Sequence, residues 1–446
     1  MANVQVIIPS ALNKGAGEKK IKIDASTLKE ALDVLIESNG KDFARRVLDS
    51  NGKPRSLINI YVNGKNIRFT GGLDTILKDG DEIVILPAVA GGAEFSRIEL
   101  ERYSRQIMLD NIGYDGQLKL RSAKVCVVGV GGLGSPIAMQ LTAMGIGHIR
   151  IIDRDVVEIS NLHRQTLYSE EDIGKVKVEA AAKRLREINK DVEIEAIPVS
   201  INENTALEVV KDCDVVIDGL DSILARYALN DACLYYKIPY IYGGAIGMLG
   251  SAFTILPYQS ACLRCLFPSL VEDEMPTCST EGVHPSLLSI ISSIEVAEAV
   301  KIIVGKEPSL VNKLLYFDLT DLTFDLISIK RNEKCLSCSN TVKINVKSDE
   351  LLIEELCGRD MGKRTYSITP SKLQEIDIRT IIESAYKEGY DIQNKGEMGI
   401  TMLNRKEKIS ISMLKSGAAV IVGAKDEDDA LKIYSLLTSK SKSISS

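Results

Sequence analysis

The sequence predicts an α/β protein of three domains, and the central one is a doubly wound, mostly parallel sheet. Three observations predict this organisation. A strand-like run ends in the pair Gly91 and Gly92, strands alternate with helices over residues 124–242, and a smaller α/β pattern follows residue 340. Such alternation is typical of parallel sheets covered by helices on both faces. We therefore expect domains at residues 1–92, 93–340 and 341–446.

The composition is that of a globular protein. Of the 446 residues, 45% are hydrophobic and 26% are charged, and the net charge is −6. This charge gives no reason to expect nucleic acid or an anionic membrane as a partner. No apolar run approaches the roughly 18 residues that span a bilayer, and the first residues lack a signal-peptide pattern. We therefore expect a reducing cytoplasm, where the nine cysteines serve as metal ligands, nucleophiles or core residues.

The first domain carries alternating strand and helix signals. Residues 4–9 and 20–23 predict a strand pair, and residues 24–38 predict a helix that Ser26 can cap. Residues 58–62 predict a further strand that enters an Asn-Gly turn. Together these signals predict a sheet crossed by one helix.

This domain resembles the ubiquitin-like MoaD/ThiS sulfur carriers, which have a β-grasp fold. The resemblance rests on V-N-G at residues 62–64, on L-D-T-I-L-K-D-G-D-E-I-V-I-L-P at residues 73–87, and on the final Gly91 and Gly92. It implies a substrate tail joined to Ala93 by an amide, so that the carrier has no free carboxylate until a processing protease cuts after Gly92. The alternatives are a permanent domain that serves a separate carrier, or a contact module whose glycines form a linker.

A glycine-rich turn follows the strand expected at residues 124–130. Its spacing fits G-x-G-x-x-G between a strand and a helix, where glycines let phosphates approach the N–H groups of the helix start. Asp153 ends the next strand and can reach ribose hydroxyls. An NAD-dependent oxidoreductase would share these features, so they leave the nucleotide open. The glycines are Gly129, Gly131, Gly132 and Gly134.

Four further segments favour ATP. They read R-Y-S-R-Q at residues 102–106, D-R-D-V-V-E-I-S-N-L-H-R-Q at 153–165, G-K-V-K-V-E at 174–179 and D-G-L-D-S at 218–222. Together they resemble the MoeB/ThiF/HesA family, the prokaryotic relatives of ubiquitin-activating enzymes. The resemblance implies an adenylyltransferase that joins AMP to the C-terminal glycine of a ubiquitin-like carrier. Ser222 stands where the family has Asn, which leaves open the polar contact expected there.

The resemblance also implies a role for each charged residue. ATP and the attacking carboxylate are both anionic, so cations must offset their repulsion. We expect Arg105, Arg164 and Lys177 to do so, with Arg105 reaching the triphosphate of the other protomer in a homodimer. Asp221 is expected to bind Mg²⁺. The expected nucleotide-binding residues are Gly129, Gly131, Gly132, Gly134, Asp153, Ser160, Asn161, Arg164, Lys177, Asp221 and Ser222.

Eight of the nine cysteines divide into three groups. Cys262, Cys265, Cys335 and Cys338 form two CxxC pairs, and four thiolates suit a structural zinc ion; two redox pairs are the alternative. Cys278 matches a family cysteine that binds the carrier covalently in some members and is dispensable in others, so both roles stay open. A third group falls in apolar patterns and is expected in the core: Cys126, Cys213 and Cys233.

Residues 341–446 resemble a C-terminal α/β domain that some MoeB/ThiF proteins carry, with no activity that we can assign. The whole pattern predicts an ATP-dependent adenylyltransferase that prepares a sulfur carrier for thiocarboxylation, in molybdopterin, thiamine or tRNA thiolation, or for conjugation. A sulfur donor protein is an expected partner. The alternatives are an NAD-dependent Rossmann oxidoreductase and a non-catalytic scaffold with a ubiquitin-like module.

Overall fold

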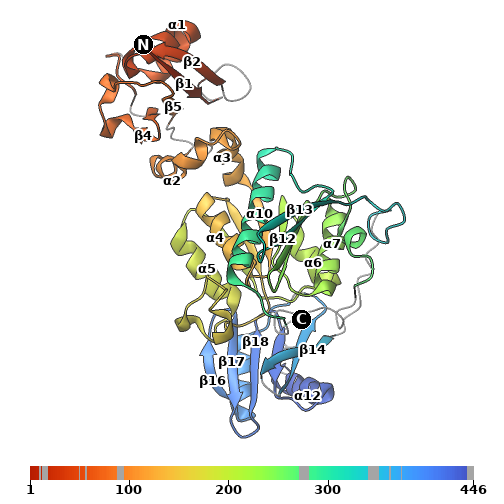
Figure 1. Cartoon of the computed structure of the whole chain (residues 1–446). Helices are drawn as coiled ribbons and strands as arrows, with labels where there is room; N and C mark the ends of the chain where they lie inside the picture. The colour runs from red at the N-terminus through yellow and green to blue at the C-terminus, as the bar shows by residue number, and fades with distance from the viewer. Residues whose placement is uncertain are drawn as a thin grey trace. The chain divides into compact units, whose positions relative to one another are not determined.

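The structure is a computed structural model, and it divides into two compact units, Met1–Ser122 and Ala123–Ser446 (Figure 1). No helix in the part of the chain that it describes is long and apolar enough to cross a membrane. The predicted domain boundaries after residues 92 and 340 stay predictions. The described residues are 1–9, 12, 19–49, 51–55, 58–87, 95–270, 281–339, 351–360, 363–372 and 374–438.

The first unit is a five-stranded sheet in the order β2-β1-β5-β3-β4. The strands β1 and β5 pair in parallel at its centre and the other pairs are antiparallel, as in a β-grasp fold. Its elements are β1 (Ala2–Ile8), β2 (Lys19–Ala25), α1 (Leu28–Val47), β3 (Ile58–Val62), β4 (Lys65–Asn66), η1 (Ile67–Phe69), η2 (Gly72–Asp74), β5 (Glu82–Pro87), α2 (Arg97–Ile107) and α3 (Gly113–Ser122).

The start of α1 differs from the sequence prediction. The predicted helix began at residue 24 with Ser26 as its cap, but pairing with β1 keeps residues 24 and 25 in the strand β2. The cap is Thr27, whose Oγ1 accepts a hydrogen bond from the Glu30 N–H at 3.3 Å. The Glu30 carboxylate in turn accepts from the Ser26 N–H at 2.7 Å. Sheet pairing therefore moves the cap from Ser26 to Thr27 and the first helical residue from 24 to Leu28.

The second unit contains an eight-stranded sheet in the order β13-β12-β11-β10-β9-β6-β7-β8. The strands from β10 to β8 are parallel, and β11, β12 and β13 continue the sheet antiparallel. Its elements are β6 (Lys124–Val128), α4 (Gly134–Met144), β7 (His148–Ile152), η3 (Ile159–Asn161), η4 (Glu170–Asp172), α5 (Lys177–Ile188), β8 (Glu193–Ile197), α6 (Glu203–Val210), β9 (Val215–Asp218), α7 (Ile223–Tyr236), β10 (Tyr240–Ile246), β11 (Leu249–Ile255), α8 (Leu263–Leu266), α10 (Pro285–Val304), β12 (Lys313–Asp318) and β13 (Thr323–Ser328).

The strand order reverses between β6 and β9. From β6 the chain passes to β7 and β8 on one side, and then returns to β9 on the other side. In doubly wound sheets, ligands bind beyond the carboxyl ends of the strands at such a switch point. Gly129 follows β6 and Gly219 follows β9, so both turns lie at this position.

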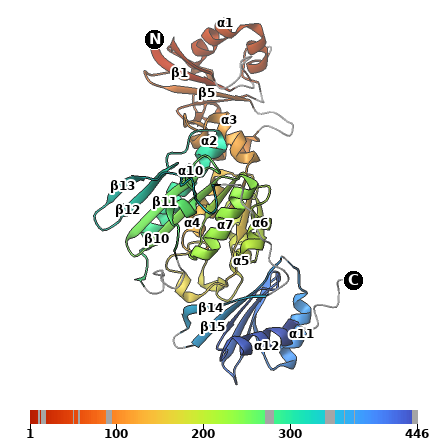
Figure 2. The same ribbon diagram turned by 90° about the vertical axis from the view of Figure 1, so that its right-hand side faces the viewer.

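The same compact unit holds a second, antiparallel sheet of six strands in the order β14-β15-β19-β18-β17-β16. The helices α11 and α12 pack side by side against it and enclose its core (Figure 2). Its elements are β14 (Leu351–Asp360), β15 (Lys363–Pro370), α11 (Ile378–Lys387), β16 (Asp391–Lys395), β17 (Gly399–Asn404), β18 (Ile409–Leu414), β19 (Ala419–Val422) and α12 (Glu427–Thr438). We call residues 351–438 the C-terminal sheet domain.

Candidate functional site

The glycine-rich turn after β6 packs backbone to backbone against the turn after β9. Gly129 has φ +88°, and a Cβ there would lie 2.5 Å from the Gly219 carbonyl oxygen. A Cβ on Gly134 would collide with the Gly129 carbonyl. At Gly131, in contrast, the nearest side chain would be Gln165 at 3.7 Å. Only glycine therefore fits the contact points, while Gly131 leaves room for a ligand beside the start of α4.

Asp153 holds the turn in place. Its carboxylate accepts hydrogen bonds from the Val130 N–H at 2.9 Å and from the Asp155 N–H at 2.8 Å. Burial raises the pKa of this carboxyl, and the Lys177 charge opposes that shift. The Val130 carbonyl is also bonded, to the Tyr168 hydroxyl at 2.9 Å. The contact of Asp153 with a ribose stays a prediction, but its role in fixing the glycine turn is established.

Lys177 lies at the first position of α5, and its side chain is only 6% exposed. Its Nζ donates to the Asp155 carboxylate at 3.1 Å, and its backbone N–H donates to the Asp155 carbonyl at 2.9 Å. An opposite charge at this distance favours the charged form of a lysine. Lys177 is therefore held against Asp155, which lies two residues after Asp153 in the sequence.

The S-N-L-H-R-Q segment folds on itself. Asn161 is buried, and its Oδ1 accepts from the Glu158 N–H at 3.1 Å. Arg164 donates from Nη1 to the Ser160 carbonyl at 2.8 Å and lies 2.9 Å from His163 Nε2. These bonds give the segment a defined shape. The predicted nucleotide contacts of Ser160, Asn161 and Arg164 stay predictions.

Asp218, at the end of β9, is fully buried and is a residue to which sequence reasoning gave no role. Its carboxylate accepts from Arg226 Nε at 3.0 Å and from the Tyr240 hydroxyl at 2.6 Å. Arg226 also donates from Nη2 to the Leu220 carbonyl at 2.5 Å and to the Gly243 carbonyl at 2.8 Å. The D-G-L-D-S pattern was the available signal. The cluster ties the loop after β9 to the neighbouring strand β10.

That loop presents Asp221, which is exposed at the carboxyl end of the sheet. The next residue, Ser222, caps α7 by accepting from the Ala225 N–H at 3.3 Å. Serine and asparagine are both favoured as helix caps, so Ser222 fits this position in place of the Asn of the family pattern. Whether Ser222 also contacts a nucleotide stays a prediction.

Glu295 of α10 is the second buried acid near this cluster. It is 0% exposed, and neither carboxylate oxygen has a hydrogen-bond partner among the described residues. Burial raises its pKa well above the ordinary value, and the nearby Asp218 charge raises it further. The nearby Arg226 charge opposes this rise of the pKa, and the Glu295 side chain packs against Gly243 of β10.

The C-terminal sheet domain contacts the segment that carries Lys177. The Glu179 carboxylate accepts from the backbone N–H groups of Glu397 at 3.0 Å and Met398 at 3.1 Å, in the turn between β16 and β17. Arg154 pairs with Glu354 of β14 at 2.8 Å. Sequence reasoning found no role for this domain, and these contacts place it against two of the nucleotide-site motifs.

Two more bonds from the same hairpin reach the backbone just before α5. Asn394 Nδ2 donates to the Ile173 carbonyl at 2.9 Å, and Thr401 Oγ1 donates to the Gly174 carbonyl at 2.9 Å. Gly174 has φ +83°, so this backbone adopts a conformation that favours glycine. The β16–β17 hairpin is therefore hydrogen-bonded to the turn that precedes Lys177.

The two CxxC pairs come together, as predicted. All four Sγ atoms lie within 4.8 Å of one another, with Cys262 and Cys335 at 3.6 Å and Cys265 and Cys338 at 3.5 Å. The cluster joins the α8 region to the chain after β13. Four converging sulfurs are the donor set of a closed tetrahedral site, so the residues fit a structural zinc ion.

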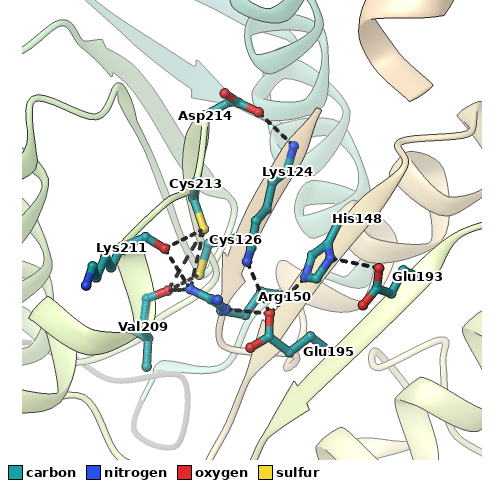
Figure 3. Close-up of polar contacts among 10 residues, drawn as sticks. All are labelled: Lys124, Cys126, His148, Arg150, Glu193, Glu195, Val209, Lys211, Cys213 and Asp214. Atoms are coloured by element: carbon teal, nitrogen blue, oxygen red, sulfur yellow. Dashed lines mark hydrogen bonds and ion pairs between the residues drawn. The ribbon is translucent and has the colours of Figure 1, made fainter. Parts of the chain in front are cut away.

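The cysteines predicted as core residues are buried, and two of them lie at the other end of the parallel sheet (Figure 3). Arg150 there donates to the Val209 carbonyl at 2.6 Å and lies 3.7 Å from Cys213 Sγ. Cys126 Sγ also points to the Val209 carbonyl, at 3.6 Å. Strand starts surround this cluster, whereas the glycine turn follows the strand ends. Cys126 and Cys213 are therefore structural.

Four predicted positions do not belong to the described part of the second unit. Cys278, Gly91 and Gly92 lie outside the described residues. Arg105 belongs to the first unit, where its Nη1 donates to the Gly64 carbonyl at 3.0 Å. Its predicted reach to a triphosphate stays a prediction.

Comparisons with known proteins support both predicted families. Residues 103–337 match the ThiF family and residues 6–92 match the ThiS family. The chain is 33% identical over 344 residues to "adenylyltransferase and sulfurtransferase MOCS3" of Culex quinquefasciatus, covering 75% of this chain and 78% of that protein. It is 36% identical over 252 residues to "sulfur carrier protein adenylyltransferase" of Thermus thermophilus, covering 55% and 93%.

Two further matches agree. The chain is 39% identical over 241 residues to "SAMP-activating enzyme E1" of Haloferax volcanii, covering 54% of this chain and 89% of that protein. Among solved structures, E. coli MccB is similar with a TM-score of 0.50 and 26% identity, covering 57% of this chain and 76% of that one. The predicted adenylyltransferase class agrees with these relatives.

Proposed function

Because this chain belongs to the ThiF family, we propose that it uses ATP to adenylate the C-terminal glycine of a ubiquitin-like sulfur carrier. The observation that carries the proposal is the joined pair of turns after β6 and β9, with the buried cation Lys177 at the start of α5. The named relatives that act on sulfur carriers support the choice of substrate. They also favour adenylation over the two alternatives, hydride transfer to NAD and a scaffold without activity.

The chemistry follows from charge. The carrier's terminal carboxylate attacks the α-phosphate of ATP, the bond to the β-phosphate breaks, and pyrophosphate leaves with the electron pair. Backbone N–H groups at the start of α4 hold phosphate oxygens beside Gly131. Lys177 and Arg164 offset the negative charge as it moves to the leaving group. The charge on Lys177 needs no reorganisation because Asp155 already fixes its position.

Two metals complete the proposal. Asp221, exposed on the loop fixed by Arg226, would hold a Mg²⁺ ion, which neutralises the phosphates when bound. The four cysteines would hold zinc, which stabilises the fold around α8. Arg105 would serve the neighbouring site of a homodimer. Cys278 is the residue that we propose for a covalent link to the carrier.

The partners are those that the chemistry requires. The carrier is either a separate protein or the chain's own first domain after a protease cuts behind Gly92. A sulfur donor protein then reacts with the acyl-adenylate. The pathway, which includes molybdopterin, thiamine or tRNA thiolation, follows from the carrier. A four-thiolate zinc site is the use of cysteine expected in a reducing compartment, and we propose the cytoplasm.

The test is ATP–pyrophosphate exchange with a carrier that ends in a free Gly-Gly. We expect exchange to depend on the carrier and on Mg²⁺. A matched carrier extended by one alanine has no reactive carboxylate at its glycine and should give none. Equal exchange with both carriers would refute the proposed substrate. Calorimetry with ATP and NAD separates adenylation from an oxidoreductase.

A further inference from the structure

The sheet of the first unit has two apolar faces, and different helices cover them. Along β5, Ile83 and Ile85 point into the core under α1, whereas Val84 and Leu86 point to the opposite face. The period of two along a strand produces this division. The face opposite α1 is closed by α2 and α3. We call it the second face.

The second face forms a buried, aromatic-rich contact. The sheet contributes residues that are at most 6% exposed, and the helices contribute residues that are at most 2% exposed. Phe95 is at its centre, in edge-to-face contact with Tyr103 at 6.0 Å and Tyr114 at 5.4 Å. From the sheet come Ile7, Tyr61, Val84 and Leu86, and from the helical side come Phe95, Leu100, Tyr103, Ile107 and Tyr114.

Two polar contacts join the same two sides beside this apolar centre. Arg105 Nη1 donates to the Gly64 carbonyl at 3.0 Å, in the turn between β3 and β4. Lys20 of β2 forms an ion pair with Asp110, after α2. An apolar centre with a polar rim is the pattern of a specific protein–protein interface.

The helical side is separate from the β-grasp sequence. The ThiS match ends at residue 92 and the ThiF match starts at residue 103, within α2. The helix α2 also has its own start signal, because Ser96 and Glu99 form a capping box. The contact therefore joins a carrier-like domain to the first helices of the enzyme-like part.

From this contact we infer that α2 and α3 are a docking surface for the β-grasp domain of this chain, and that they keep the domain bound after the chain is cut behind Gly92. Cutting adds water across the amide between Gly92 and Ala93, and gives a Gly92 carboxylate and an Ala93 ammonium. The new tail then stays at a high effective concentration for the enzyme. The biological meaning rests on the proposed function, but the binding itself does not.

The experiment inserts a specific protease site between Gly92 and Ala93 of the full-length chain, cuts it, and measures the size of the products by gel filtration at micromolar concentration. We expect the fragments to elute together. Separate elution of a β-grasp fragment that circular dichroism shows to be folded would overturn the inference. Exchange activity is assayed in parallel: co-elution without exchange refutes only the proposed function, and exchange without co-elution refutes only the docking surface.

A variant pair tests which residues hold the fragments. Leu100→Ala/Tyr103→Ala removes two buried side chains of the second face. Hot-spot energetics predict that the affinity between the two fragments falls roughly tenfold or more. Ile98→Ala/Leu109→Ala removes apolar side chains that are 64% and 55% exposed, and should bind as wild type. If the first pair fails to fold, Tyr61→Ala weakens the contact from the sheet side. Equal retention by all variants would contradict the inference.

Discussion

The hydrogen bonds from the C-terminal sheet domain to the turn before α5 can be tested by substitution. Asn394→Ala/Thr401→Val removes both hydrogen bonds that reach the carbonyls of residues 173 and 174. A neutral hydrogen bond contributes about 0.5–1.5 kcal/mol net, and the Asn394 bond is exposed, so the pair contributes about 1–2 kcal/mol. If this energy positions Lys177, kcat/KM for ATP in the exchange reaction should fall roughly 5- to 30-fold.

Two controls separate positioning from a general loosening. The single variants Thr401→Ser and Thr401→Val are compared in the exchange assay. Thr401→Ser keeps the hydroxyl and should retain the wild-type kcat/KM, whereas Thr401→Val should lower it. Asn204→Ala removes a different bond between the same domains, from Nδ2 to the Ser371 carbonyl at 2.9 Å, and should leave kcat/KM unchanged. An unchanged kcat/KM in the double variant, or an equal loss in Asn204→Ala, would refute this account of the hairpin.

Three further predictions concern buried groups. Lys177→Met keeps the side-chain length and removes the charge, so the rate of ATP–pyrophosphate exchange should fall roughly 10²- to 10³-fold. The circular dichroism spectrum without ATP should stay close to that of wild type. Glu295→Gln should raise the urea midpoint of unfolding at pH 8 more than at pH 5. The pKa of Glu295 is raised in the folded protein, so wild-type stability falls as the pH rises above the unfolded value of 4.5. Equal gains at both pH values would contradict this. Cys335→Ser should abolish binding of one zinc per chain, measured by metal analysis, and lower Tm by roughly 5–15 °C; full zinc retention would contradict the four-sulfur site.

The sequence predicted most elements of the central sheet because each is marked locally. The strand expected at residues 124–130 is an apolar run, and β6 (Lys124–Val128) lies within it. The four cysteines were also predictable, because CxxC spacing has few other uses. In each case a short pattern determines the structure that contains it.

Contacts between distant segments carried no such local mark. The bond from Thr401 to Gly174 joins residues that are 227 positions apart, and neither residue type is unusual in a loop. The second face was hidden for a similar reason, because Val84 and Leu86 look like ordinary alternating strand residues. The cluster of Asp218, Arg226 and Tyr240 likewise forms only when the fold brings β9, α7 and β10 together.

The central claim is that Asp221 and the turns beside it activate ATP for a carrier carboxylate. Its most direct test is ATP–pyrophosphate exchange by wild type and Asp221→Ala side by side, each with the same carrier ending in free Gly-Gly and with Mg²⁺. The account predicts carrier-dependent exchange by wild type and its loss in Asp221→Ala, while both proteins melt at the same temperature. No exchange by wild type, or full exchange by Asp221→Ala, would contradict it.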